Sequence, residues 1–517
     1  MRLIGLDDAK SRVLLRRENG DFIKPLGWSP DGTRILTAFF RTSPRRLIYE
    51  IGFVSVLDGS VDVIKSAQGV SGYSYISGMS LAPDGRYIAC EAPADDEAGQ
   101  RDIFLLSADG SRESPLIKNP ADDHSPIWSA DGKRILFISD RGGKPGVWMA
   151  DVVEGKSEGA SVLIKADIGE FGKWMGITNE GECFYAIKTQ REDIYIADFD
   201  PLSTAILGKA EALAGRFVGS NNGPAWSPDG EYLAYFRHSI EKRGDSGAST
   251  IIVRSIKTGE ESELPNKLNQ PHSIQWFPEG KSLLVSSFRS PKDRDYSIDF
   301  YRIDVNNGAT DIILQGDGGT QSFRPGLSPD GRQIFFFCKK QPDETVLKSY
   351  DLESREEKEL YLPGHDMTMR VSISLSPDGH QLAFVEDNGA RPPVFTVKTM
   401  EVTGENPREL LRAQWPEIVN GQRALAWTAD GKHLMIVKMT FSSGKKPAGS
   451  QQALYKDELL RIPVEGGPIQ KANLHARELD SLSIHPNGSL AAFSALSENP
   501  PYEIWMMKNF LPEENKK

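Results

Sequence analysis

Short runs of alternating apolar residues recur along the chain, each preceded by a turn signal of the Ser-Pro-Asp-Gly type. Examples are WSPDGTRILTAFF from Trp28 and WSPDGEYLAYFRH from Trp226, and there are ten copies, of which ITNEGECFYAIKT from Ile177 is the weakest. In such a turn Pro fixes φ near −65°, Asp tolerates the next position, and Gly takes the left-handed position that follows. The pattern therefore predicts a β-hairpin in every copy.

Two further apolar runs separated by a Gly, Asp or Asn turn follow most hairpins, as in IIVRSIKTGEESEL from Ile251. The acidic or amide residue before the turn glycine recurs every 47 to 57 residues. Four strands in a repeat of this length are typical of a propeller blade. The sequence predicts an all-β fold, a β-propeller of about ten four-stranded blades over residues 1–517, with blades starting near residues 24, 77, 124, 173, 222, 272, 323, 371, 423 and 480.

The chain begins out of phase with its own repeat. Residues 2–16 resemble the third and fourth strands of a blade, whereas the chain ends after a third strand, EIWMMKNFL from Glu503. Residues 1–17 could supply closing strands to the last blade and so remove an exposed sheet edge. We expect one large ring on this reasoning, with two smaller propellers as the alternative.

The repeated WSPDG-type turns resemble the PD40, or WD40-like, repeat of the TolB type, and the resemblance covers essentially the whole chain. It implies a propeller fold and a protein-binding role in the bacterial envelope. The ending EIWMMKNFLP also resembles propeller arrays at the C-termini of large bacterial regulators, which implies a sensor role. The chain departs from TolB in having ten copies rather than six, and in lacking the N-terminal domain and export signal.

Charge and composition narrow the class of partner and the compartment. The net charge is −11, which argues against a general nucleic-acid binder, and no apolar run is long enough for a transmembrane helix. Cys90, Cys183 and Cys338 lie far apart in apolar runs and are expected to be buried free thiols. Free thiols and the lack of a signal peptide suit the cytoplasm, whereas the TolB resemblance suggests the envelope.

No linear motif for catalysis is found. A serine peptidase of the prolyl-oligopeptidase type would need a hydrolase domain with a G-x-S-x-G elbow, which the chain lacks. The GDSG at Gly244–Gly247 is expected to be a surface loop, and Asp293, Asp295 and Asp299 do not form an EF-hand. We therefore predict no cofactor, no metal and no catalytic residues.

Basic residues recur at one end of the predicted blades. One set ends the second strands: Arg41, Arg141, Lys188, Arg237, Arg289, Lys339 and Lys438. A second set begins the first strands: Lys24, His124, Lys173, His272 and Arg423. Both positions map to the same face of the predicted propeller. One interpretation is solvated or ion-paired strand ends. The other is an electropositive face for an acidic peptide or protein segment.

The leading hypothesis is a non-catalytic binding propeller for a protein or peptide partner. The first alternative is a propeller enzyme, a hydrolase or lyase, because a site built from one residue per blade in the central channel leaves no linear motif. A structural scaffold is the third. The sequence does not choose among them, and it predicts neither nucleic-acid binding nor membrane insertion.

Overall fold

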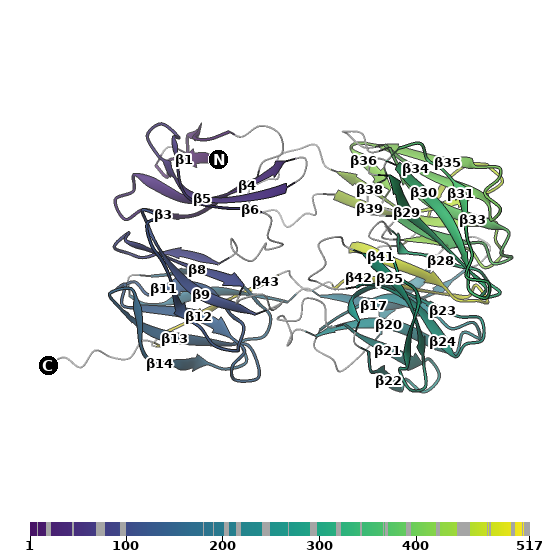
Figure 1. Cartoon of the computed structure of the whole chain (residues 1–517), viewed down its shortest axis with the longest axis horizontal. Helices are drawn as coiled ribbons and strands as arrows, with labels where there is room; N and C mark the ends of the chain where they lie inside the picture. Colours follow the sequence, from purple (N-terminus) through teal and green to yellow (C-terminus); the bar gives the residue numbers. More distant parts are fainter. Residues whose placement is uncertain are drawn as a thin grey trace. The chain divides into compact units, whose positions relative to one another are not determined.

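The computed structural model describes residues 1–7, 9–16, 22–43, 46–68, 78–93, 100–178, 180–189, 191–200, 206–213, 219–239, 249–266, 268–289, 297–316, 322–341, 344–365, 367, 371–388, 394–419, 424–441, 455–472, 474, 477–497, 502–508 and 510. The regular elements of this part are all β-strands, which confirms the all-β prediction (Figure 1). They fall into two compact units. Unit 1 is Met1–Thr189 with Glu241–Asp245 and Pro500–Lys517, and unit 2 is Gln190–Ile240 with Ser246–Asn499.

Unit 1 contains a hairpin and four sheets, all antiparallel. The hairpin joins β1 (Arg2–Ile4) to β2 (Ser11–Val13). Three sheets have four strands each: β3 (Phe22–Trp28), β4 (Arg34–Ser43), β5 (Arg46–Ser55) and β6 (Val61–Gln68); β7 (Met79–Leu81), β8 (Tyr87–Pro93), β9 (Arg101–Ser107) and β10 (Glu113–Ile117); β11 (Asp123–Trp128), β12 (Arg134–Ser139), β13 (Gly146–Val153) and β14 (Lys156–Lys165). The fourth sheet has three strands, β15 (Phe171–Ile177), β16 (Cys183–Lys188) and β43 (Tyr502–Met507).

Unit 2 contains six sheets. One combines β17 (Glu192–Phe199) and β18 (Ile206–Ala212) with β41 (Arg477–Ile484) and β42 (Leu490–Leu496). Three of the others have four strands each: β19 (Gly219–Trp226), β20 (Tyr232–Ser239), β21 (Ser249–Ser255) and β22 (Glu261–Leu264); β23 (Asn269–Trp276), β24 (Ser282–Phe288), β25 (Ile298–Asp304) and β26 (Thr310–Leu314); β28 (Gly326–Leu327), β29 (Gln333–Gln341), β30 (Glu344–Asp351) and β31 (Glu357–Tyr361). The next sheet consists of β32 (Val371–Leu375), β33 (Gln381–Asp387), β34 (Val394–Glu401) and β35 (Arg408–Gln414), with β27 (Ser322–Arg324) beside β32. The last consists of β36 (Glu417–Val419), β37 (Leu425–Trp427), β38 (His433–Phe441), β39 (Tyr455–Pro463) and β40 (Gln470–Lys471).

The predicted hairpin turns are confirmed. All ten turn glycines have positive φ, from +66° at Gly280 to +83° at Gly181. In the first copy the Ser29 hydroxyl donates to the Asp31 carboxylate, which also accepts from the backbone N–H of Thr33 at 3.1 Å. These hydrogen bonds lower the pKa of Asp31 to about 2. The acid of the motif therefore fastens the turn as an acceptor.

Neighbouring turns also pack on one another. A Cβ at Gly331 would lie 2.7 Å from the ring of Pro278, which belongs to the preceding turn, so that glycine is required by close approach as well as by its φ of +72°. In unit 2 the last turn packs on the first in the same way. The centroids of the His485 and Trp226 rings lie 4.8 Å apart, and a Cβ at Gly230 would collide with the His485 ring.

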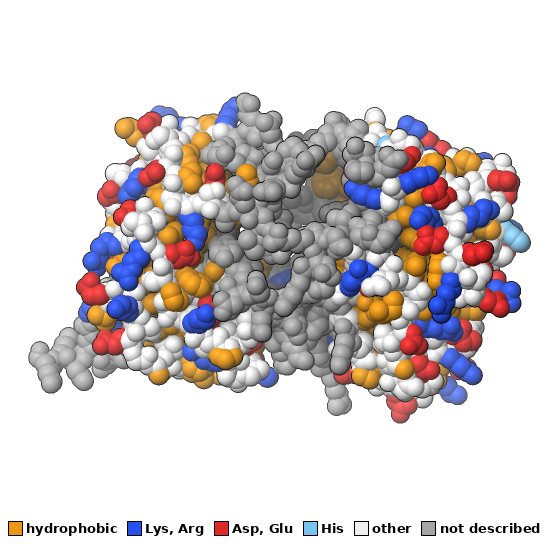
Figure 2. Space-filling view, in the orientation of Figure 1, with side chains coloured by type: hydrophobic (Ala, Val, Ile, Leu, Met, Phe, Trp, Pro, Cys, Tyr) orange, Lys and Arg blue, Asp and Glu red, His pale blue; other side chains and the backbone are white. Residues whose placement is uncertain are grey.

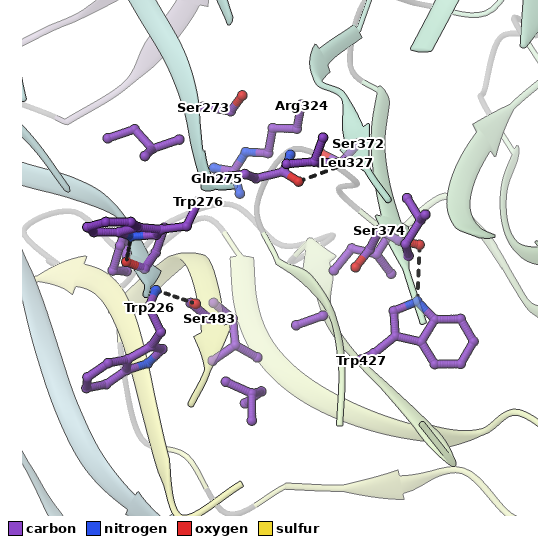
Figure 3. Close-up of a pocket in the computed structure, with 18 of the residues that line it drawn as sticks. Trp226, Ser273, Gln275, Trp276, Arg324, Leu327, Ser372, Ser374, Trp427 and Ser483 are labelled. Atoms are coloured by element: carbon purple, nitrogen blue, oxygen red, sulfur yellow. Dashed lines mark hydrogen bonds between the residues drawn. The ribbon is translucent and has the colours of Figure 1, made fainter. Parts of the chain in front are cut away.

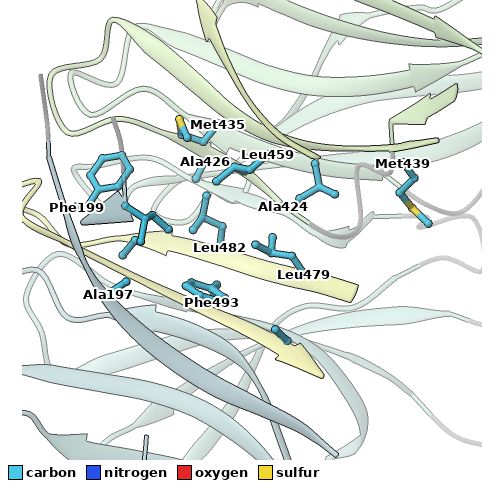
Figure 4. Close-up of a cluster of buried hydrophobic side chains, with 14 residues drawn as sticks. Ala197, Phe199, Ala424, Ala426, Met435, Met439, Leu459, Leu479, Leu482 and Phe493 are labelled. Atoms are coloured by element: carbon cyan, nitrogen blue, oxygen red, sulfur yellow. The ribbon is translucent and has the colours of Figure 1, made fainter. Parts of the chain in front are cut away.

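The six sheets of unit 2 pack face to face in a closed cycle. Buried clusters join each sheet to the next, and the cycle closes where Phe199 and Phe493 of the β17–β18–β42–β41 sheet pack on Met435 and Leu459 of the β36–β40 sheet (Figure 4). The closing sheet is mixed from distant segments, because β17 pairs with β42 from Glu192↔Leu496 to Asp198↔Leu490. This pairing locks the two ends of unit 2 together, as ring closure does in propellers.

Unit 1 is a stack of sheets in which described apolar clusters join consecutive neighbours. At one end the β1–β2 hairpin covers the β3–β6 sheet, where Leu14 packs on Ile35, Phe39 and Val54. The expectation that residues 1–17 complete the last blade differs from this arrangement. In the described residues β1 and β2 pair with each other, and β17 and β18 take the place beside β42. Whether the blades form one ring or two smaller propellers stays a prediction.

Two of the tryptophans before the turns donate hydrogen bonds to neighbouring sheets. The Trp276 indole Nε1–H donates to the Ala225 carbonyl at 2.9 Å, and that of Trp427 donates to the Ser374 carbonyl at 3.1 Å. Trp226 is equally buried, yet its indole nitrogen has no hydrogen-bond partner within the described part of the chain.

We expect Trp276→Phe to lower the free energy of unfolding of unit 2 by about 1 kcal/mol more than Trp226→Phe does, because only the former removes a buried hydrogen bond. The difference in free energy of unfolding between the two variants is measured by equilibrium unfolding in urea, with hydrogen exchange of unit 2 peptides as the readout. Equal losses for the two variants would contradict this role of the Trp276 indole.

Candidate functional site

A cavity of about 540 Å³ lies within unit 2, lined by residues of the innermost strands of all six sheets. Its wall combines tryptophan rings, small apolar side chains and serines, including Trp226, Trp276, Ser273, Ser374 and Ser483 (Figure 3). The serines supply hydroxyls that both donate and accept hydrogen bonds. A cavity of this size, with polar and apolar groups in its wall, is a candidate ligand site.

Arg324 ends β27 and is one of the residues that line this cavity. Pro325 has no N–H, and the inner strand of its sheet is split there into β27 and β28. The Gln275 side chain bridges the break, accepting from the Leu327 N–H at 3.2 Å and donating to the Pro325 carbonyl. β27 pairs with β32 in parallel, which leaves Arg324 among the residues of the cavity wall (Figure 3).

Arg324 is the cation in the described lining, where no aspartate or glutamate is present. Its guanidinium donates to the Ser481 hydroxyl and lies 3.7 Å from the Asp480 carboxylate, with a quarter of the side chain (24%) exposed. Burial, followed by the charge of Asp480, raises the pKa of Glu192, which accepts from the Asn222 amide at 3.2 Å. The Asp480 carboxylate therefore lies beside the arginine, and the charges of both residues act on Glu192.

His272 lies beside the same arginine and forms an edge-to-face contact with Phe288. Burial, and then the charge of Arg324, lower the pKa of His272 to about 4. The imidazole is consequently neutral at pH 7, so at that pH the positive charge in the described wall belongs to Arg324.

This depressed pKa predicts acid sensitivity. Because the imidazole pKa is lower in the folded than in the unfolded chain, its stabilising contribution is present above about pH 6.5 and is lost as pH falls toward 4. Between pH 7 and pH 5 we expect unit 2 to lose about 2 kcal/mol through this group. His272→Gln should remove that part of the pH dependence. If urea unfolding shows the same pH dependence of the free energy of unfolding in the variant and the wild type, this role of His272 is contradicted.

The predicted cationic residues are divided between the two units. Five of those at the ends of second strands are ion-paired: Arg141 with Asp123 at 2.7 Å, Lys188 with Glu170 at 3.3 Å, Arg237 with Glu261 at 2.6 Å, Arg289 with Asp299 at 2.9 Å, and Lys438 with Glu417 at 2.7 Å. Figure 2 likewise shows basic and acidic side chains interspersed. In these five the positive charge is balanced locally.

The other predicted positions lie in varied surroundings. Lys173 and Lys339 are exposed, and Lys24 and His272 are half-buried. His124 is buried with its Nδ1 3.0 Å from the Ser125 hydroxyl. The side chain of Arg41, and Arg423 altogether, lie outside the described residues. The wider cationic face stays a prediction.

Sequence reasoning did not select Arg324, Glu192 or Gln275. One signal pointed to Arg324: it directly follows Phe323, a predicted channel-mouth position. The three cysteines are free and buried. Among the described residues there is no group of three or more potential metal ligands from His, Cys, Asp and Glu, and no helix that could cross a bilayer.

Among proteins of known identity, dipeptidyl-peptidase 5 of Porphyromonas gingivalis is 25% identical over 271 residues, 50% of this chain and 37% of that protein. The Tol-Pal system protein TolB of Helicobacter pylori is 25% identical over 195 residues, 35% of this chain and 40% of that protein. The chain thus matches less than half the length of either relative.

Solved structures of the same kind include TolB from Acinetobacter baumannii, at 16% identity and a TM-score of 0.31, covering 74% of this chain and 81% of that one. Puromycin hydrolase matches at 15% identity and a TM-score of 0.29, covering 74% of this chain and 61% of that one. The family model of the TolB β-propeller domain, PD40, matches residues 3–207 and 183–415, well over half of the chain. The chain therefore belongs to the PD40 family of TolB β-propeller domains.

Proposed function

We propose that unit 2 is a non-catalytic binding module for a protein or peptide partner, and that an acidic segment of this partner enters the cavity. The observation that carries the proposal is the composition of the wall, in which Arg324 is the cation among serine hydroxyls and tryptophan rings. A guanidinium with adjacent hydroxyl donors suits a carboxylate, and tryptophan supplies contact area at small entropic cost.

The wall also favours an extended chain over a bulky ligand. Serines of several inner strands alternate with apolar residues, as in Ser372, Ile373 and Ser374 of β32. Hydroxyls at this spacing can hydrogen-bond the backbone of a peptide, while the apolar residues between them pack on the neighbouring sheets. Arg324 also lies near a carboxylate, that of Asp480, but unlike the five cations described above it lines the cavity, so the proposal assigns anion recognition to Arg324.

The test is fluorescence anisotropy of a labelled nonapeptide of alternating Glu and Gly, with its Gln analogue as the neutral probe. We expect the full chain to bind the acidic peptide in preference, and Arg324→Met to weaken binding at least about tenfold, which corresponds to about 1.4 kcal/mol. The loss of one ion contact should also reduce the salt dependence of binding.

Arg332→Met is the matched control. Arg332 is exposed in the Asp330 turn between β28 and β29 and lies outside the described lining of the cavity. Its replacement by Met changes the net charge by the same amount. Equal affinities for the Arg324 and Arg332 variants would contradict the proposal, as would equal binding of the acidic and neutral peptides.

A channel enzyme is the second candidate, favoured by one observation. Glu192, with its raised pKa, and Asp480 place two carboxylates of unequal environment beside the cavity, an arrangement that general acid–base catalysis can use. Turnover of glycoside, lactone or peptide substrates that is lost in both Glu192→Gln and Asp480→Asn would support this function over simple binding.

A further inference from the structure

One third strand in unit 1 is far more exposed than the third strands of neighbouring sheets. In the β7–β10 and β11–β14 sheets the third strands, β9 and β13, are mostly buried. The third strand of the β15–β16–β43 sheet is β43, and five of its six residues are exposed. Four of them are large and apolar, with exposed fractions of 48% for Tyr502, 65% for Ile504, 46% for Trp505 and 47% for Met506.

In the other sheets of unit 1 the third strand is covered by a fourth strand. Each of the other three sheets in unit 1 ends in a fourth strand, β6, β10 or β14, that pairs antiparallel with the third. Within the described residues β43 pairs with β16 alone, so its second edge presents backbone N–H and C=O groups. An exposed apolar edge strand of this kind is a template for strand addition.

This sheet already takes a strand from a distant segment. β43 reaches β16 from more than 300 residues along the chain and pairs with it in an unbroken register from Cys183↔Met507 to Lys188↔Tyr502. Tyr502 lies over Gly172 of β15, where a Cβ would come within 2.8 Å of its ring. The sheet therefore orders an added strand by backbone pairing and by packing across its face.

The neighbouring copy of the repeat indicates which residue types would fit in a strand added beside β43. Ala186 aligns with Phe137 of the neighbouring copy, so Ile504, which pairs with Ala186, is equivalent to Trp148, and Trp505 is equivalent to Met149. In that sheet Trp148 pairs with Leu163 and Met149 with Val162. The fitting strand thus carries two consecutive apolar, β-favouring residues opposite Ile504 and Trp505.

We propose that the free edge of β43 binds an extended segment of a partner protein, which adds antiparallel as the fourth strand and places apolar side chains against Ile504 and Trp505. This site lies in unit 1 and is separate from the cavity of unit 2. Affinity comes from main-chain hydrogen bonds, and selectivity from the apolar pair, because these are the contacts that other fourth strands of unit 1 make.

The test uses the peptide KSEGASVLIK, the sequence of β14, fluorescently labelled, with the full chain. We expect it to bind and to protect the amides of residues 502–507 from hydrogen exchange. Ile504→Lys should weaken binding at least about tenfold, whereas Leu57→Lys, at an 87% exposed turn position of the same unit, should leave it unchanged. A peptide with prolines in place of Ser161 and Leu163 should not bind, since proline removes ladder donors.

Trp505→Lys serves as a second variant, and far-ultraviolet circular dichroism verifies that both variants are folded. Binding that is unchanged in both lysine variants, or protection that falls outside residues 502–507, would overturn the proposal. Self-association of the chain that Ile504→Lys abolishes, in the absence of peptide binding, would also overturn it and would assign the edge to a second copy. None of these readouts involves Arg324, so the test is independent of the proposed function of unit 2.

Discussion

Phe493→Ala is expected to destabilise unit 2 by about 3–5 kcal/mol. Phe493 is fully buried in β42 and stacks on Tyr195 of β17, with ring centroids 5.8 Å apart. It belongs to the cluster that joins the closing sheet to the β36–β40 sheet (Figure 4). Truncation therefore leaves a cavity at the point where the cycle of six sheets closes.

Urea-dependent hydrogen exchange of peptides from β17 and β42 measures this loss separately from unit 1. Leu207→Ala is the control, because Leu207 lies in β18 of the same sheet with half of its surface exposed. It should cost less than about 0.5 kcal/mol. If the two truncations cost the same, the closing sheet does not hold unit 2 together.

Arg141→Met is expected to destabilise unit 1 by about 3 kcal/mol or more, because it leaves a buried carboxylate without its cation. The Arg141 guanidinium donates to both oxygens of Asp123, at 2.7 and 2.8 Å, and the Asp123 side chain is fully buried. Burial raises the pKa of Asp123. Protonation relieves the unpaired charge, so the cost of the substitution should be smaller at pH 5 than at pH 7.

The double variant Arg141→Met with Asp123→Asn should recover most of the stability, since both charges are then absent. Arg86→Met, which removes an exposed partner of Asp84, should cost less than about 1 kcal/mol. Thermal unfolding of the four chains measures these differences. A neutral Arg141→Met would contradict a structural role and would favour the predicted cationic binding face.

Most of the fold can be predicted from the repeat, because the residues that specify each turn are adjacent in the sequence. Pro30, Asp31 and Gly32 specify one turn whatever lies elsewhere, and the same chemistry recurs down to Gly488. The strand exchange that shapes unit 2 is not local. IYIADF in β17 and EIWMM in β43 have the same apolar pattern, so nothing in either segment tells which second strand it joins.

The site was less accessible to sequence reasoning for two physical reasons. Cations at strand ends were recognised, but their neutralisation depends on acids that register brings opposite, as Glu261 of β22 meets Arg237 of β20. Arg324 was overlooked because sequence reasoning considered basic residues at the ends of second strands and four residues before the Trp/Leu/Ile slot, whereas Arg324 lies three residues before Leu327.

Hydrogen exchange of the full chain with and without the acidic nonapeptide tests the proposed binding function of unit 2 most directly. We expect slower exchange in the inner strands that line the cavity, above all β23, β27 and β32, and loss of this protection in Arg324→Met. Protection confined to unit 1, or the same protection in wild type and Arg324→Met, would contradict it.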